Sequence, residues 1–79
     1  MTLEEANKVP IQAVTSSRIM GIGYDESQRT LVIVFKGEKR YGYYPIQPEA
    51  HKAFISAESK GKWFEENIKN NTTVTTQKF

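Results

Sequence analysis

The change in hydrophobic periodicity at Pro45 constrains the fold of this chain most strongly. Residues 19–44 contain runs rich in β-branched and aromatic residues, the clearest being Thr30–Phe35, which is apolar on both faces. After Pro45, apolar residues recur at helical spacing. The sequence therefore predicts an α+β domain. A small three-stranded antiparallel sheet over residues 19–44 is followed by two short helices, near 48–58 and 62–69, packed on one face.

The two ends of the chain differ in composition from the segment between them. Thr2 and Glu5 have the spacing of a capping box, so residues 1–9 can form a helical turn. With little apolar surface to bury, this segment is expected to be a flexible N-terminal arm. Residues 70–79 are polar and rich in threonine, which predicts a disordered tail. The folded domain is expected to span residues 10–69.

A chain of 79 residues can enclose only a small core. The core is expected to take the apolar side of each predicted strand and helix. Its predicted members are Leu31, Ile33, Phe35, Phe54, Ala57, Phe64 and Ile68.

The loop between the second and third predicted strands can be closed in two ways. A two-residue loop at Gly37–Glu38 would pair Phe35 with Arg40, and its turn chemistry is favourable. A three-residue loop would pair Phe35 with Tyr41 and collect the larger side chains on one face. A shift of one residue moves every side chain to the opposite face. Hydrophobic sorting favours the second register, helped by a bulge.

Several chemistries are excluded by composition. The absence of cysteine rules out disulfides, thiol nucleophiles and iron–sulfur sites, and His51 is the only histidine. The neighbours Glu65 and Glu66 would point about 100° apart on a helix, so they cannot easily act on one bond. We therefore expect no catalytic residue, no metal site and no cofactor.

The start of the chain and the length of its apolar runs bear on its location. Thr2–Glu5 is acidic where a secretion signal would be basic, and no apolar run is long enough to span a membrane. The expected location is the cytoplasm, without membrane association.

Tyrosines and basic residues gather around the third predicted strand. Tyr41 and Tyr43 alternate on it, and Lys39 and Arg40 lie beside its turn. Small sheets use such tyrosines to stack nucleic-acid bases, with nearby cations holding phosphates. Tyr24 belongs to the same set of aromatic residues that cannot all be buried. The alternative is that Tyr41 and Tyr43 complete the core beneath the helices.

A second candidate site combines small polar residues from two distant segments. Ser16, Ser17, Ser59 and the backbone of Gly61 could cradle an anion or nucleotide at a helix start. In the nucleic-acid interpretation, Lys62, which lies near Ser59, would add a second phosphate contact. The structural alternative is that Ser59 only caps a helix.

An ordered series of motifs runs through the chain. Its members are Val14-x-Ser16-Ser17, Gly23-Tyr24-Asp25, Leu31-x-Ile33-x-Phe35, Tyr41-x-Tyr43 and Ala57-x-Ser59-x-Gly61. Over residues 12–69 this series resembles the KTSC domain, a family named for a C-terminal extension of some lysyl-tRNA synthetases that also occurs as stand-alone bacterial and phage proteins. The resemblance implies RNA binding, by analogy with the synthetase.

Three functions remain open from the sequence. The first is a non-catalytic module that binds RNA or another nucleic acid. The second is a protein-interaction module, an accessory protein of a phage or bacterium that docks on a host protein through exposed aromatic residues. The third is a small protein that binds an anion or nucleotide. A homo-oligomer is compatible with each of them.

Overall fold

The computed structural model describes all 79 residues and confirms the α+β class. One antiparallel sheet has five strands in the order β1-β2-β3-β4-β5, rather than the three predicted. The strands are β1 (Gln12–Ala13), β2 (Ile19–Asp25), β3 (Thr30–Phe35), β4 (Lys39–Tyr44) and β5 (Thr75–Lys78). The helical elements are α1 (Leu3–Lys8), α2 (Pro48–Ser56), α3 (Lys60–Phe64) and a π-helical turn, η1 (Glu65–Lys69).

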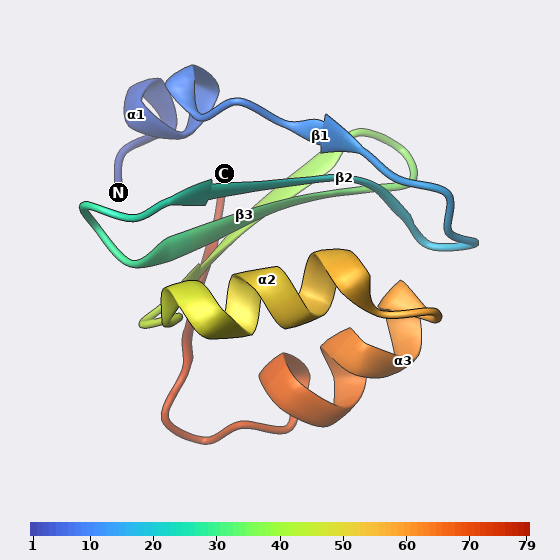
Figure 1. Ribbon diagram of the computed structural model, residues 1–79. Coiled ribbons are helices and arrows are strands. Elements are labelled where there is room, and N and C mark those ends of the chain that lie inside the picture. Colours follow the sequence, from blue (N-terminus) through green and yellow to red (C-terminus); the bar gives the residue numbers. More distant parts are fainter.

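Helices cover both faces of this sheet. Figure 1 shows α2 and α3 on one face and α1 on the other. The two predicted helices are confirmed with shifted ends. The first ends at Ser56, before the predicted residue 58, and the second begins at Lys60, before the predicted residue 62. Ser59 is the N-cap of the second helix, and its Oγ accepts a hydrogen bond from the Lys62 amide at 3.4 Å. No helix combines the length and apolar character needed to cross a bilayer.

The C-terminal segment forms a strand, so the predicted disordered tail is wrong for residues 75–78. This strand, β5, pairs with β4 from Tyr44↔Thr75 to Tyr41↔Lys78. The Asn71 side chain organises the preceding turn by accepting a hydrogen bond from the Thr73 amide at 3.0 Å. All four side chains of β5 are exposed, so backbone pairing holds the strand and no hydrophobic alternation marks it in the sequence.

The N-terminal segment is packed on the sheet, so the prediction of a flexible arm is also wrong. The capping box of Thr2 and Glu5 is present at the start of α1. Ala6 is completely buried and Val9 is 7% exposed, and both pack with Val32 of β3. Because β3 is apolar on both faces, the face turned away from α2 also needs a cover.

Two glycines of β2 allow the chain after α1 to lie directly on the sheet. A Cβ on Gly23 would come within 2.6 Å of the Pro10 carbonyl oxygen, and one on Gly21 within 2.4 Å of Ile11 Cγ2. The register of β2 against β3 also shifts between Ile19 and Gly21. Glycines inside a strand are typical of bulges and of close backbone approach, and both occur here.

The hairpin between β3 and β4 adopts neither predicted register. The loop has three residues, but Phe35 pairs with Lys39 rather than with Arg40 or Tyr41. Gly37 and Glu38 both have positive φ, 86° and 62°, and the Glu38 amide donates to the Phe35 carbonyl at 3.0 Å. The observed register differs from the favoured one by two residues. The predicted sorting is therefore kept, and the larger side chains share one face.

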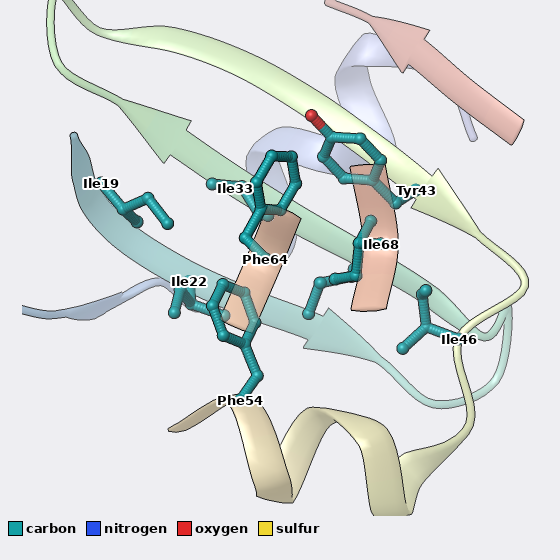
Figure 2. Close-up of a cluster of buried hydrophobic side chains, with 9 residues drawn as sticks. Ile19, Ile22, Ile33, Tyr43, Ile46, Phe54, Phe64 and Ile68 are labelled. Carbon is teal, nitrogen blue, oxygen red and sulfur yellow. The ribbon is translucent and has the colours of Figure 1, made fainter. Parts of the chain in front are cut away.

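The main core lies between the sheet and the helices α2 and α3, and Figure 2 shows its side chains pointing toward one another. Five of the seven predicted members are confirmed: Leu31, Ile33, Phe54, Phe64 and Ile68. Phe35 is only partly buried at the margin of this core. Ala57 is outside it because α2 ends at Ser56 and Ala57 is an extended C-cap. Three core residues were not predicted, Ile19, Ile22 and Ile46, and Tyr43 lies in the core as the structural alternative for this tyrosine expected.

Replacing Phe54 with alanine should destabilise the protein strongly, because its ring is completely buried in the main core and stacks on Trp63 at 4.8 Å. We expect Phe54→Ala to lower the free energy of unfolding by about 3–5 kcal/mol in a urea titration. Lys52→Ala, at an exposed position of the same helix, is the matched control and should change it by less than about 0.5 kcal/mol. Similar losses in both variants would contradict this packing.

Gly23→Ala should detach the N-terminal segment while leaving the main core folded. The added Cβ would meet the Pro10 carbonyl, a backbone atom that can move only if the segment shifts. Hydrogen exchange followed by NMR should show lost amide protection in α1 and retained protection in β3. Unchanged protection in α1 would show that the sheet tolerates a side chain here.

Candidate functional site

Strand β4 divides its polar and aromatic residues between two faces of the sheet. Lys39, Tyr41 and Tyr43 lie on the face covered by α3 and η1. Arg40 pairs with Val34 and lies on the opposite face, where its Nη1 is 3.4 Å from Asn7 Oδ1 in α1. Of the two predicted basic partners of the tyrosines, only Lys39 is beside them. Arg40 is therefore not available to a ligand that contacts Tyr41.

An aromatic groove opens at the end of the main core, between the β3–β4 hairpin and the segment α3–η1. Its volume is about 460 Å³. The residues that line it, which define the aromatic groove below, are Phe35, Tyr41, Tyr43, Phe64, Arg18, Lys39, Lys69 and Thr76. The groove thus combines four aromatic rings with three cationic side chains.

Edge-to-face contacts fix the rings of this groove. Phe35 meets Tyr41 with ring centroids 5.6 Å apart and an interplanar angle of 84°. Phe64 contacts both Phe35 and Tyr43, at 5.5 Å and 5.3 Å. Such arrangements are favourable for aromatic pairs. The floor of the groove is therefore formed before any ligand arrives.

Tyr43 is a core residue that also lines the groove. Its side chain is 5% exposed, and in Figure 2 its ring lies beside Phe64. The hydroxyl makes no hydrogen bond within the chain, yet no buried side-chain polar atom lacks a partner, so this oxygen is not completely enclosed. Burial, with a smaller contribution from Tyr41, raises the pKa of Tyr43 to about 12. Tyr43 therefore cannot stack a base, and the stacking surface is reduced to half-buried Tyr41 with Phe35.

Tyr24 lies outside the aromatic groove and has a structural role. Its ring stacks on His51 with centroids 4.8 Å apart, and its hydroxyl donates to the Ile46 carbonyl at 2.5 Å. Burial raises the pKa of Tyr24 and lowers that of His51. Both side chains thus hold the start of α2 against β2.

The predicted anion cradle is brought together by the fold. A polar depression of about 240 Å³, called the hydroxyl depression below, is lined by residues from two segments. Thr15, Ser16, Ser17 and Arg18 come from the segment before β2, and Glu58, Ser59, Lys60, Gly61 and Lys62 come from the start of α3. Five of them are predicted site residues: Ser16, Ser17, Ser59, Gly61 and Lys62.

Part of the hydroxyl depression is already occupied by internal hydrogen bonds. Ser16 Oγ accepts from the amides of Arg18 and Ile19, at 3.3 Å and 3.4 Å. Lys60 Nζ donates to the Ala57 carbonyl at 2.6 Å and so closes the end of α2. The hydroxyl protons of Ser16 and Ser59 are left to donate to another group.

Arg18 joins the hydroxyl depression to the aromatic groove, and sequence reasoning missed it. It lines both sites, and its Nη1 donates to Glu65 Oε1 at 2.7 Å. This hydrogen bond and the charge of Arg18 lower the pKa of Glu65. A Cβ on Gly61 would lie 2.8 Å from Arg18 Nη2, so the missing side chain of Gly61 makes room for the guanidinium. Arg18 lies far in the sequence from the other basic residues, so it forms no basic cluster that would indicate a site.

Comparison with known proteins places this geometry in a family. The model of the KTSC domain matches residues 15–71. The chain belongs to the KTSC family. The match includes both ends of the Arg18–Glu65 pair and all of the hydroxyl depression, whereas α1, β1 and β5 lie outside it.

The KTSC fold of this chain is also present in a solved structure. The crystal structure of a KTSC domain protein from Yersinia pestis is 39% identical in sequence and superposes with a TM-score of 0.83, over 90% of this chain and 97% of that chain. A protein from Tsukamurella paurometabola is 38% identical over 67% of this chain and 79% of its own length. A protein from Stutzerimonas stutzeri is 33% identical over 72% of this chain and 80% of its own length.

Tyr43 should make the KTSC domain less stable at high pH. Its pKa is about 12 in the folded protein, above the ordinary value of 10.0, so its contribution to stability is complete below pH 10 and is lost as the pH rises toward 12. We expect the melting temperature of the wild type to fall more steeply above pH 10 than that of Tyr43→Phe. Parallel curves for the two proteins would contradict the burial of this phenol.

Proposed function

We propose that this KTSC domain is a non-catalytic cytoplasmic module that binds single-stranded nucleic acid, with RNA as the preferred ligand. The observation that carries the proposal is the aromatic groove, in which a preformed aromatic floor has three cations at its rim. Proteins that bind single strands combine these two features, because every base can stack and every nucleotide carries a phosphate.

The size and shape of the aromatic groove suit one base. A volume of about 460 Å³ accommodates a single ring system with its sugar. Tyr41 is half-buried, with part of its ring open to the groove, and its edge contact with Phe35 holds it in place. A base would therefore stack on a ring that is already ordered, which reduces the entropic cost of binding.

The cations of the aromatic groove come from three separate parts of the chain. Arg18 precedes β2, Lys39 begins β4 and Lys69 ends η1. Three phosphate contacts predict a slope of log affinity against log salt of about 2 in magnitude on a single strand. Such binding is weak and tolerant of sequence.

Two further features favour RNA over DNA. The hydroxyl groups of Tyr41, Tyr43 and Thr76 are the uncharged polar groups of the groove, and they could bind a ribose 2′-hydroxyl. The synthetase extension for which the family is named points in the same direction.

A second candidate function is binding of a small anion or nucleotide in the hydroxyl depression. The observation that favours it is the convergence of two serine-containing segments around one polar depression. Calorimetric titration with inorganic phosphate and with a nucleoside monophosphate tests it. Heat from phosphate alone, reduced by Ser59→Ala, would support this candidate over the first.

Tyr41→Ala should weaken nucleic-acid binding without unfolding the protein. Loss of one stacking ring costs about 1–3 kcal/mol, which is a factor of about 5–150 in affinity. The measurement is the fluorescence anisotropy of a labelled single-stranded poly-uridine RNA at low salt. The matched control is Tyr44→Ala, because Tyr44 is an exposed tyrosine of the same strand outside the groove.

The two tyrosine variants separate the proposal from its competitors. Tyr44→Ala should bind the RNA as the wild type does. Equal losses in both variants would place the ligand elsewhere on the surface. If neither RNA nor single-stranded DNA binds the wild type at low salt, the nucleic-acid function is wrong and a protein partner becomes the candidate.

A further inference from the structure

The cation at the junction of the two candidate sites, Arg18, is already paired with a carboxylate. Arg18 is held by Glu65 at 2.7 Å, and Glu65 is the only acidic residue in contact with a cation of the aromatic groove. Lys39 and Lys69, the other two cations of the groove, take part in no ion pair. A phosphate at this junction must therefore compete with the Glu65 carboxylate.

The Arg18–Glu65 pair is exposed to solvent. Its side chains are 48% and 44% exposed, and ion pairs in such positions contribute little to stability. Only Nη1 is bonded to Glu65, while Nη2 lies over Gly61. A guanidinium binds phosphate through two parallel N–H groups, a geometry that a single carboxylate contact leaves open.

We infer that Glu65 is a specificity-determining residue of the aromatic groove. Glu65 positions Arg18 and is displaced from it only by the phosphate of a nucleotide whose base stacks in the groove. The inference rests on the proposed function. A free phosphate gains only the exchange of one anion for another at Arg18. A nucleotide also gains the contact of its base with Tyr41 and Phe35, so it can displace the carboxylate where inorganic phosphate cannot.

Removing the charge of Glu65 should weaken this discrimination. We expect Glu65→Gln to bind single-stranded poly-uridine RNA about two- to fivefold more tightly than the wild type, the range that an exposed ion pair corresponds to. Inorganic phosphate should then compete with the RNA more effectively than it does in the wild type. Glu66→Gln removes the same charge from the next residue, which is exposed and forms no ion pair, and is the matched control.

A double-mutant cycle with Arg18→Gln shows whether the effect passes through Arg18. In the Arg18→Gln background, Glu65→Gln and Glu66→Gln should change the affinity for RNA by the same factor. Circular dichroism should show all variants folded, because the substituted side chains are about half exposed or more. The NMR signal of the Arg18 Nε–H group should shift on RNA addition, because the guanidinium exchanges its carboxylate partner at Nη1 for a phosphate.

Each result decides between the inference and its alternatives. Equal effects of Glu65→Gln and Glu66→Gln in the wild-type background would overturn the inference while RNA binding itself stands, because only net charge would then matter. An advantage of Glu65→Gln that persists without Arg18 would overturn it in the same way. Absence of RNA binding by the wild type and by every variant would instead overturn the proposed function, and the inference with it.

Discussion

Strand β3 carries apolar side chains on both faces, and the rest of the chain is arranged to cover them. Leu31 and Ile33 face the main core under α2 and α3, and Val32 faces Ala6 and Val9 on the other side. Because a sheet of this size gains stability only when its apolar faces leave water, both covers are needed. The glycines of β2 and the capping box of α1 allow the second cover to form. The helical periodicity after Pro45 does not indicate this cover.

The aromatic groove lies where the first of these covers ends. Phe35, the last residue of β3, is only partly buried, and Phe64 closes the core beside it. Two of the cations lie at the ends of elements that meet there, because Lys39 is the first residue of β4 and Lys69 is the last residue of η1. The aromatic groove therefore lies at the margin of the core, where aromatic rings that stabilise the fold are also in contact with solvent. Tyr43 has both roles, because its ring packs in the core and its hydroxyl is not completely enclosed.

Elements that depend on hydrophobic periodicity and helix capping could be predicted from the sequence. Elements that depend on backbone pairing and backbone torsion angles could not. The helices after Pro45 and most of the core carry strong patterns. Strand β5 carries none, because its four side chains are exposed and its stability comes from pairing with β4. The hairpin register depends on the positive φ of Glu38, a residue that rarely adopts it. Among the site residues, the predicted grouping of the serines with Gly61 agrees with the hydroxyl depression. Arg18 joins them only because the fold brings distant segments together.

The aromatic groove is the proposed ligand-binding surface of this KTSC domain. The most direct test is an NMR titration of isotopically labelled protein with single-stranded poly-uridine RNA at low salt. We expect amide and side-chain shift changes confined to the groove, at Arg18, Phe35, Tyr41 and Lys69, with Met20 and Tyr44 unchanged because they lie outside it. Shift changes centred on Met20 and Tyr44, with the groove unaffected, would contradict it.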